Sequence, residues 1–327
     1  MTYALLIQNR AGVTVDYAEV TDSVEFTTNR TGSPGKLSFT IHKPKEVYGG
    51  FNEGDPVRFS VDGTNIFFGF IFRKEKDRWG HIAITCYDQL RYLKSNESYC
   101  FVGLTAGEII KKIAGDFQLN VGSIDDTGFA IPYFVKEDKS CLDIISEAVQ
   151  LTTMNTGKIF VFYDDAGKLA LKESKNLLID SVLGDKSLVT DYTYTTDIDK
   201  ETYSKIKLVR PNKETGKADV YIVEDSAAIK KWGILQLYET VDENMNAAQI
   251  TEQAKTMLSY YNRTLRTLSL PGCLGVVGLR AGAMVAMNIP NLGDISLTSF
   301  VLLEKVNHKF KNDMHTMDIE IRITSPK

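Results

Sequence analysis

The sequence predicts a mainly β protein with a small α+β insert near its middle. Apolar and polar residues alternate with a period of two up to about residue 93, change to a period of 3.6 between about residues 99 and 183, and return to alternation afterwards. At 327 residues the chain is about twice as long as an ordinary domain, so we expect two or three compact units. We place them at residues 1–98, 99–186 and 187–327.

The N-terminal segment reads as a β unit. Alternation is visible in Val24-Glu25-Phe26 and in Leu37-Ser38-Phe39-Thr40-Ile41, with turn residues between them. From Gly54 to Asp88 the pattern predicts three consecutive antiparallel strands.

Two amphipathic helices are predicted in the middle segment. Thr105 and Glu108 have the spacing of a capping box before the first helix, and Ser140 can cap the second, with Asp143 at its third position. Residues 158–171 then read as a hairpin whose turn is Asp164-Asp165-Ala166-Gly167.

Strands return in the C-terminal segment. A turn is expected at Asn212–Gly216, and a helix at about residues 247–262, capped by Asn246 with Gln249 at its third position. The expected strands are 191–195, 204–210, 218–223, 265–270, 284–289, 300–306 and 317–323.

One pattern near the N-terminus occurs again near the C-terminus. Gly54-x-x-Val57-x-Phe59 matches Gly282-x-x-Val285-x-Met287, a turn residue followed by alternate apolar positions. Two more segments match in the same order: Phe68-Gly69-Phe70-Ile71 with Phe300-Val301-Leu302-Leu303, and Ile82-x-Ile84-x-Cys86 with Met317-x-Ile319-x-Ile321. The second copy needs a longer loop, around Pro290–Asp294. The pattern indicates a duplicated unit; the alternative is that any two antiparallel meanders look alike.

Composition argues against several classes of function. With 43% hydrophobic residues the chain can form cores, and with a net charge of −4 and a pI of about 5.7 it lacks the basic excess of proteins that bind nucleic acid. The longest apolar run, Ile66–Phe72, is much shorter than the roughly 20 residues of a membrane-spanning helix. Met1–Arg10 reads as a strand and not as a signal peptide. We therefore expect a soluble protein that makes no membrane contact and no direct sequence-specific contact with nucleic acid.

The sequence contains no recognisable catalytic or metal-binding motif. His42, His81, His308 and His315 lack metal-site spacing, and no phosphate-binding glycine loop or nucleophile elbow occurs. The four cysteines contain no C-x-x-C pair, which favours reduced, buried thiols. We predict no enzyme activity, no catalytic or metal-ligating residues and no cofactor.

Taken in order, these segments resemble the baseplate hub proteins of contractile-tailed phages and phage-tail-like bacteriocins, in the short form of defective prophages. Asp55-x-Val57, Phe68-Gly69-Phe70-Ile71 and Cys86-Tyr87-Asp88 are the most characteristic part, followed by the insert, Gly282-x-x-Val285 and Phe300–His308. The resemblance implies two tail-tube-like β-barrels joined by the α+β domain, a homotrimer, and a distant relationship to the N-terminal hub region of VgrG of type VI secretion.

The same resemblance implies a role and a set of partners. Three chains with two barrels each would form a pseudo-six-fold ring between the hexameric tail tube and a three-fold central spike, which would be a separate protein because the sequence ends at Lys327 without a spike β-helix. Tape-measure, LysM-containing baseplate and wedge proteins are further expected partners. Assembly would take place in the cytoplasm of the host bacterium, and the product would be part of a phage tail or an extracellular tail-like particle.

Two other functions remain open from the sequence. A particle-associated cell-wall hydrolase would need acidic side chains with raised pKa values in a groove. A surface carbohydrate-binding β module would need exposed aromatic residues, for which Tyr192, Tyr194 and Tyr260-Tyr261 are the candidates.

Overall fold

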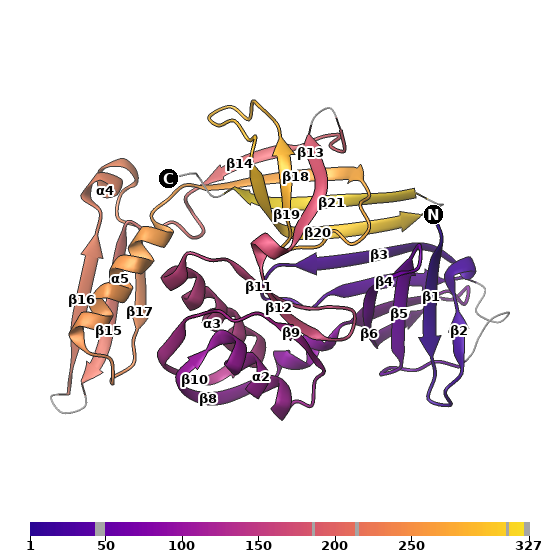
Figure 1. Cartoon of the computed structure of the whole chain (residues 1–327), viewed down its shortest axis with the longest axis horizontal. Helices are drawn as coiled ribbons and strands as arrows, with labels where there is room; N and C mark the ends of the chain where they lie inside the picture. Colours follow the sequence, from indigo (N-terminus) through magenta and orange to yellow (C-terminus); the bar gives the residue numbers. More distant parts are fainter. Residues whose placement is uncertain (43–49, 185–186, 213–215, 312–313, 324–327) are drawn as a thin grey trace.

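The computed structural model describes residues 1–42, 50–184, 187–212, 216–311 and 314–323 (Figure 1). The fold is mainly β, as predicted, and a 13-stranded sheet runs through the parts of the chain near both ends. Its strand order is β14-β18-β21-β20-β3-β4-β7-β6-β5-β1-β2, with β13 and β19 attached beside β20.

The first β unit contributes seven strands of this sheet. These are β1 (Tyr3–Gln8), β2 (Thr14–Asp16), β3 (Thr21–Asn29), β4 (Lys36–Ile41), β5 (Pro56–Val61), β6 (Thr64–Lys76) and β7 (Ile82–Tyr87). A short 3-10 turn, Ala18–Val20, precedes β3, and another, Gln89–Lys94, follows β7. The three antiparallel strands predicted between Gly54 and Asp88 are confirmed as β5, β6 and β7.

The second β unit contributes the other six strands. These are β13 (Leu178–Gly184), β14 (Thr193–Asp197), β18 (Leu265–Leu274), β19 (Met284–Asn288), β20 (Phe300–Lys311) and β21 (Met314–Ile323). Strand β13 pairs in parallel with β19, so the sheet of the second unit begins before the boundary at residue 186 that the sequence suggested. The long loop around Pro290–Asp294 lies between β19 and β20, where the first unit has only the tight turn Asp62-Gly63.

The insert, residues 96–173, packs its two helices around a core of its own. Its elements are β8 (Asn96–Thr105), α2 (Ala106–Asp116), β9 (Val121–Ile124), β10 (Ala130–Ser140), α3 (Cys141–Thr156), β11 (Phe160–Asp164) and β12 (Leu169–Glu173). Both predicted N-caps are confirmed: Thr105 and Glu108 form the capping box of α2, and the Ser140 hydroxyl accepts the amide hydrogen of Asp143 at 3.1 Å. The 3-10 turn Ser174–Asn176 leads from the insert to β13.

A fourth group of elements, which we call the side unit (residues 205–261), projects from one end of the molecule (Figure 1). It contains β15 (Lys205–Asn212), β16 (Lys217–Glu224), α4 (Ser226–Trp232), β17 (Gln236–Thr240) and α5 (Ala247–Tyr261). The predicted α5 and its Asn246–Gln249 capping box are confirmed. Residues 213–215 of the predicted turn lie outside the described part of the chain.

The side unit is separate because α5 covers its own small sheet. Ile250, Ala254 and Met257 of α5 pack on Ile206 and Leu208 of β15, in a core distinct from that of the second β unit. The sequence-based boundaries placed both groups in one domain, because strand periodicity does not reveal which sheet a strand joins.

Candidate assembly interface

The hairpins β6–β7 and β20–β21 have the same pairing register. Ile71 pairs with Cys86 and, at the matching place, Leu303 pairs with Ile321. In both hairpins the register shifts directly after this pair, between Ile71 and Arg73 and between Leu303 and Lys305. A bulge bends a strand and strengthens its twist, so its presence at the same position gives both long strands the same local geometry.

The strand before each hairpin also matches. Val57 of β5 pairs with Gly69, and Val285 of β19 pairs with Val301. The amides of Gly54 and Gly282 donate to the carbonyls of Ile71 and Leu303 at 2.8 and 2.7 Å, and both glycines have a φ of +88°. Such a backbone conformation favours glycine, which explains why the sequence pattern begins with this residue in each copy.

The other residues of the sequence pattern fall on two faces of the sheet. Phe59, Ile82, Ile84, Met287, Met317 and Ile319 are all buried in the cores of the two β units. Phe68 and Phe300 point to the opposite face, since side chains alternate along a strand, and Phe300 is 57% exposed.

The correspondence extends to two strands that show no match at the level of sequence. Leu37 of β4 pairs with Cys86 and with Phe26 of β3, while Leu268 of β18 pairs with Ile321 and with Tyr194 of β14. The four-strand set β3-β4-β7-β6 therefore repeats as β14-β18-β21-β20. Short, threonine-rich strands carry little identity, and the side unit lies between β14 and β18 in the sequence, so this half of the repeat was missed.

The two sets join edge to edge through β20 and β3, which are antiparallel. Val306 pairs with Thr28 and His308 with Phe26. The Thr27 hydroxyl donates to Oδ1 of Asn307 at 2.7 Å across this junction. Just beyond the paired residues, Arg30 Nε lies 2.8 Å from a carboxylate oxygen of Glu304.

Apolar packing also crosses the junction. Phe310, at the end of β20, is fully buried in the core of the first β unit, and its ring lies 5.1 Å from that of Phe59. The second unit thus supplies part of the core of the first.

A buried histidine lies at the same junction. His308 Nε2 is 2.6 Å from the carbonyl oxygen of Leu279, and its ring stacks on Phe26. A carbonyl can only accept, so Nε2 carries the proton and Nδ1 accepts from Nε2 of His315 at 2.8 Å. Burial lowers the pKa of each histidine to about 4. These residues are therefore neutral structural groups at pH 7.

A half-buried arginine connects the insert to both β units. The guanidinium of Arg280 lies 3.6 Å from the ring centroid of Tyr163 and donates to the Asp164 carbonyl at 3.2 Å. Asp88, which accepts the amide hydrogens of Gly35 and Leu90, is buried near Asp164 and Arg280. Burial raises the pKa of both carboxyl groups. Both acids are enclosed by packed elements and are not displayed in an open groove.

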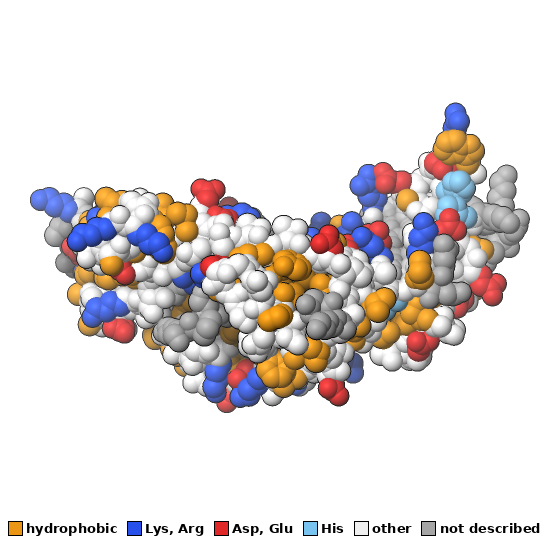
Figure 2. Space-filling view, turned by 90° about the horizontal axis from the view of Figure 1, so that it is seen from above, with side chains coloured by type: hydrophobic (Ala, Val, Ile, Leu, Met, Phe, Trp, Pro, Cys, Tyr) orange, Lys and Arg blue, Asp and Glu red, His pale blue; other side chains and the backbone are white. Residues whose placement is uncertain are grey.

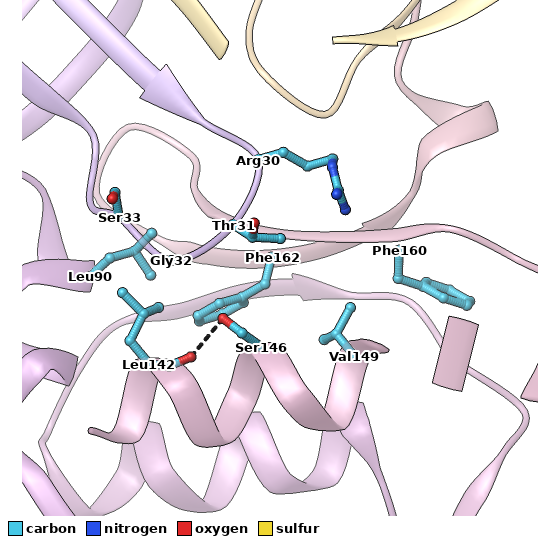
Figure 3. A pocket seen from close by; sticks show the side chains of 10 residues that line it. All are labelled: Arg30, Thr31, Gly32, Ser33, Leu90, Leu142, Ser146, Val149, Phe160 and Phe162. Atoms are coloured by element: carbon cyan, nitrogen blue, oxygen red, sulfur yellow. Dashed lines mark hydrogen bonds between the residues drawn. The ribbon is translucent and has the colours of Figure 1, made fainter. Parts of the chain in front are cut away.

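Two pockets bear on ligand binding. The first, between the loop after β3 and helix α3, has a volume of about 20 Å³ and is lined partly by Leu142, Ser146 and Phe162 (Figure 3). It has room for about one water molecule. The second is a groove of about 250 Å³ on the polar face of the β20–β3 junction.

The two acidic groups of this groove each have a lysine partner. Burial by itself would raise the pKa of Asp318. Lys309, 2.5 Å away, and the other hydrogen-bond donors outweigh this effect, so the pKa of Asp318 is lowered. Glu320 is paired with Lys305 at 3.0 Å. A general acid requires a raised pKa, and that of Asp318 is lowered.

The described ranges also bear on metal binding and membrane insertion. They contain no group of three or more acidic, histidine or cysteine side chains placed to hold a metal ion, and no helix long and apolar enough to cross a bilayer. Of the four cysteines, Cys86, Cys141 and Cys273 are buried as expected, whereas Cys100 is exposed.

Comparison with solved structures places this fold among phage tail proteins. The 43 kDa tail protein of prophage MuSo2 from Shewanella oneidensis superposes with a TM-score of 0.69 over 97% of this chain and 98% of that one, at 12% identity. The Escherichia coli c3393 protein, a type VI secretion component with structural similarity to bacteriophage T4 tail proteins, gives a TM-score of 0.54 over 94% of this chain and 74% of that one, at 11% identity.

Sequence comparison gives a closer relationship. Protein XkdQ of the phage-like element PBSX of Bacillus subtilis (strain 168) is 32% identical over 307 residues, which cover 92% of each chain. The model of the YQBQ-like family matches residues 24–322, a span that includes both four-strand sets, the insert and the side unit. The chain therefore belongs to the YQBQ-like family, and its fold is one that it shares with phage tail proteins.

Proposed function

We propose that this protein is a structural hub subunit in the baseplate of a contractile, phage-tail-like particle. The observation that carries the proposal is the internal repeat: two four-strand sets with the same order and register lie edge to edge in one chain. A single chain thus offers two similar surfaces to a partner protein that contacts this sheet.

The repeat suits a protein that joins six-fold to three-fold symmetry. Equivalent contacts cannot connect a hexameric tube to a trimeric spike, because every subunit of a symmetric ring presents the same surface. Three copies of this chain would offer six similar β units, each acting as a tail-tube-like barrel. The insert and the side unit occur once per chain, so they would keep the other surface truly three-fold.

This arrangement defines the expected partners. The tail tube would contact the pseudo-six-fold surface, and a separate central spike protein would contact the three-fold one. Tape-measure, LysM-containing baseplate and wedge proteins are further candidates. The hub would assemble in the cytoplasm of the host bacterium and leave the cell as part of the particle.

Light scattering on the purified full-length chain tests the stoichiometry. A trimer has a mass of about 110 kDa, three times the 36.6 kDa of the chain. Electron microscopy of particles carrying a tagged chain tests the location, with density between tube and spike as the expected result. A stable monomer in solution together with absence from that position in particles would contradict the proposal.

Neither alternative function gains support from a specific observation. The acids of the open groove have lysine partners, and the candidate aromatic residues do not form one exposed row. Tyr194 donates to Asp294 at 2.6 Å, and Tyr261 packs against the core of the side unit. Clearing of purified peptidoglycan by the isolated chain would favour the hydrolase instead.

A further inference from the structure

The junction within the chain is a template for a contact between chains. In the internal repeat, β6 corresponds to β20 and β14 corresponds to β3. The C-terminal half of β20 pairs with β3 inside the chain. The equivalent pairing, β6 with β14, does not occur within one chain.

Both strands have an open edge at the required place. Residues 73–76 of β6 pair with β7 on one side, and within the described ranges no strand pairs with them on the other. Strand β14 pairs with β18 alone and ends the path of the large sheet (Figure 1). Unpaired edges invite pairing with another chain, so a native protein must cover or use them.

We propose that β6 of one copy pairs antiparallel with β14 of the next copy, in the register of the β20–β3 junction. This contact rests on the proposed hub function, for which it supplies the bond between subunits. Transferring the internal register places Arg73 opposite Asp197, Glu75 opposite Thr195 and Lys76 opposite Tyr194.

The side chains brought together by this register are complementary. Arg73, which is paired with Glu75 within β6, would also meet the carboxylate of Asp197. The hydroxyl of Thr195 can donate to Glu75, as that of Thr27 donates to Asn307 within the chain. Pairing of β6 with another β6 would instead bring the basic residues Arg73, Lys74 and Lys76 of two copies together, which is unfavourable.

The end of the β6–β7 hairpin also favours β14 of a second copy as the partner of β6. Trp79 is 70% exposed and carries the Arg78 guanidinium over its ring at 4.3 Å. Figure 2 shows a projecting tip where hydrophobic, basic and histidine side chains gather. In the transferred register this tip extends toward Tyr192, which precedes β14 and is itself 41% exposed. Two exposed aromatic residues would then cover each other.

The contact joins different edges of two copies, so it is heterologous and must close into a ring or continue indefinitely. Each chain contributes the eight strands of its two four-strand sets to the continuous sheet. Three chains would close the ring that the hub function requires.

Disulfide trapping tests the pairing and its register. In a Cys100→Ser background, one full-length chain carries Glu75→Cys and another carries Thr195→Cys. Directly opposite Cβ atoms in a sheet are roughly 4.5–5.5 Å apart, near the spacing of a disulfide. Mild oxidation of the mixture should give a covalent dimer of about 73 kDa, twice 36.6 kDa, on a non-reducing gel. The chain with both changes should give a covalent trimer.

A matched control shifts the cysteine by one residue. Lys74→Cys mixed with Thr195→Cys places the two thiols on opposite faces of the sheet, so little cross-linking is expected. Equal cross-linking of this control, or efficient homodimers of either single variant, would overturn the proposed register.

Light scattering on the same samples separates this proposal from the hub function. A trimer without the Glu75–Thr195 cross-link overturns the edge contact and leaves the hub function standing. The cross-link in open dimers or chains that never close supports the edge contact and overturns the trimeric ring. A monomer without cross-link overturns the edge contact and counts against the trimer.

Discussion

His308 on β20 and His315 on β21 share a hydrogen bond of 2.8 Å at the junction of the two β units, and both are held neutral. The pKa of His308 falls from its ordinary 6.5 to about 4 because protonation would place a charge in the core. Between pH 6.5 and 4 the unfolded chain therefore binds more protons than the folded one, and the free energy of unfolding falls as the pH is lowered.

The first prediction concerns this pH dependence. We expect His308 alone to lower the free energy of unfolding by up to about 3 kcal/mol between pH 6.5 and 4. Urea unfolding at several pH values measures it. His308→Gln should be less stable than the wild type at pH 7, but its free energy of unfolding should change less between pH 6.5 and 4. Phe300→Ala, which removes no titratable group, should keep the wild-type slope; equal slopes in wild type and His308→Gln would refute the assignment.

The second prediction concerns the arginine that connects the insert to the β units. Arg280→Met leaves Asp88 and Asp164 buried without their neighbouring cation. We therefore expect the free energy of unfolding to fall by about 3–5 kcal/mol at pH 7. The pKa values of both acids should rise further, so the loss should be smaller at pH 5, where they bind protons more easily. Arg280→Lys, which keeps the charge but loses the planar contact with Tyr163, should recover part of the stability. Chemical denaturation at both pH values distinguishes these outcomes.

The third prediction uses the two equivalent glycines. A Cβ on Gly282 would lie 2.3 Å from a methyl carbon of Val161 in the insert, whereas a Cβ on Gly54 has no neighbour within 4 Å. Both have the same positive φ, so Gly54→Ala reports backbone strain alone, about 1 kcal/mol. Gly282→Ala should lower the free energy of unfolding by at least about 1–2 kcal/mol more, because the new Cβ also clashes with Val161. A double-mutant cycle with Val161→Ala should show coupling for Gly282→Ala and none for Gly54→Ala.

The fourth prediction compares two phenylalanines on β20. Phe310→Ala removes a fully buried ring from the core of the first unit, so we expect a loss of about 3–5 kcal/mol in the free energy of unfolding. Phe300→Ala, on the exposed face at the other end of the strand, should change it by less than about 1 kcal/mol. Thermal and urea unfolding give both values. Similar losses would mean that Phe310 does not join the two units.

The sequence alone determined many of the elements and half of the internal repeat, but it did not predict β8, β10, β13, α4 or β17. Periodicity and capping residues located α2, α3, α5 and the hairpin strands, because these signals act over a few neighbouring residues. Gly54 and Gly282 marked matching positions, since a positive φ restricts which residue can occupy them.

Only the tertiary structure decided how these elements combine. It placed β14 and β18 in the second four-strand set, gave the side unit a sheet of its own and joined β20 to β3. These results depend on which strand edges and apolar faces meet, over separations that reach more than 270 residues at the β20–β3 junction. Local periodicity carries no information about such partners. The open edges of β6 and β14 can likewise be recognised only in the tertiary structure. Their counterparts in the repeat, β20 and β3, pair with each other within the chain.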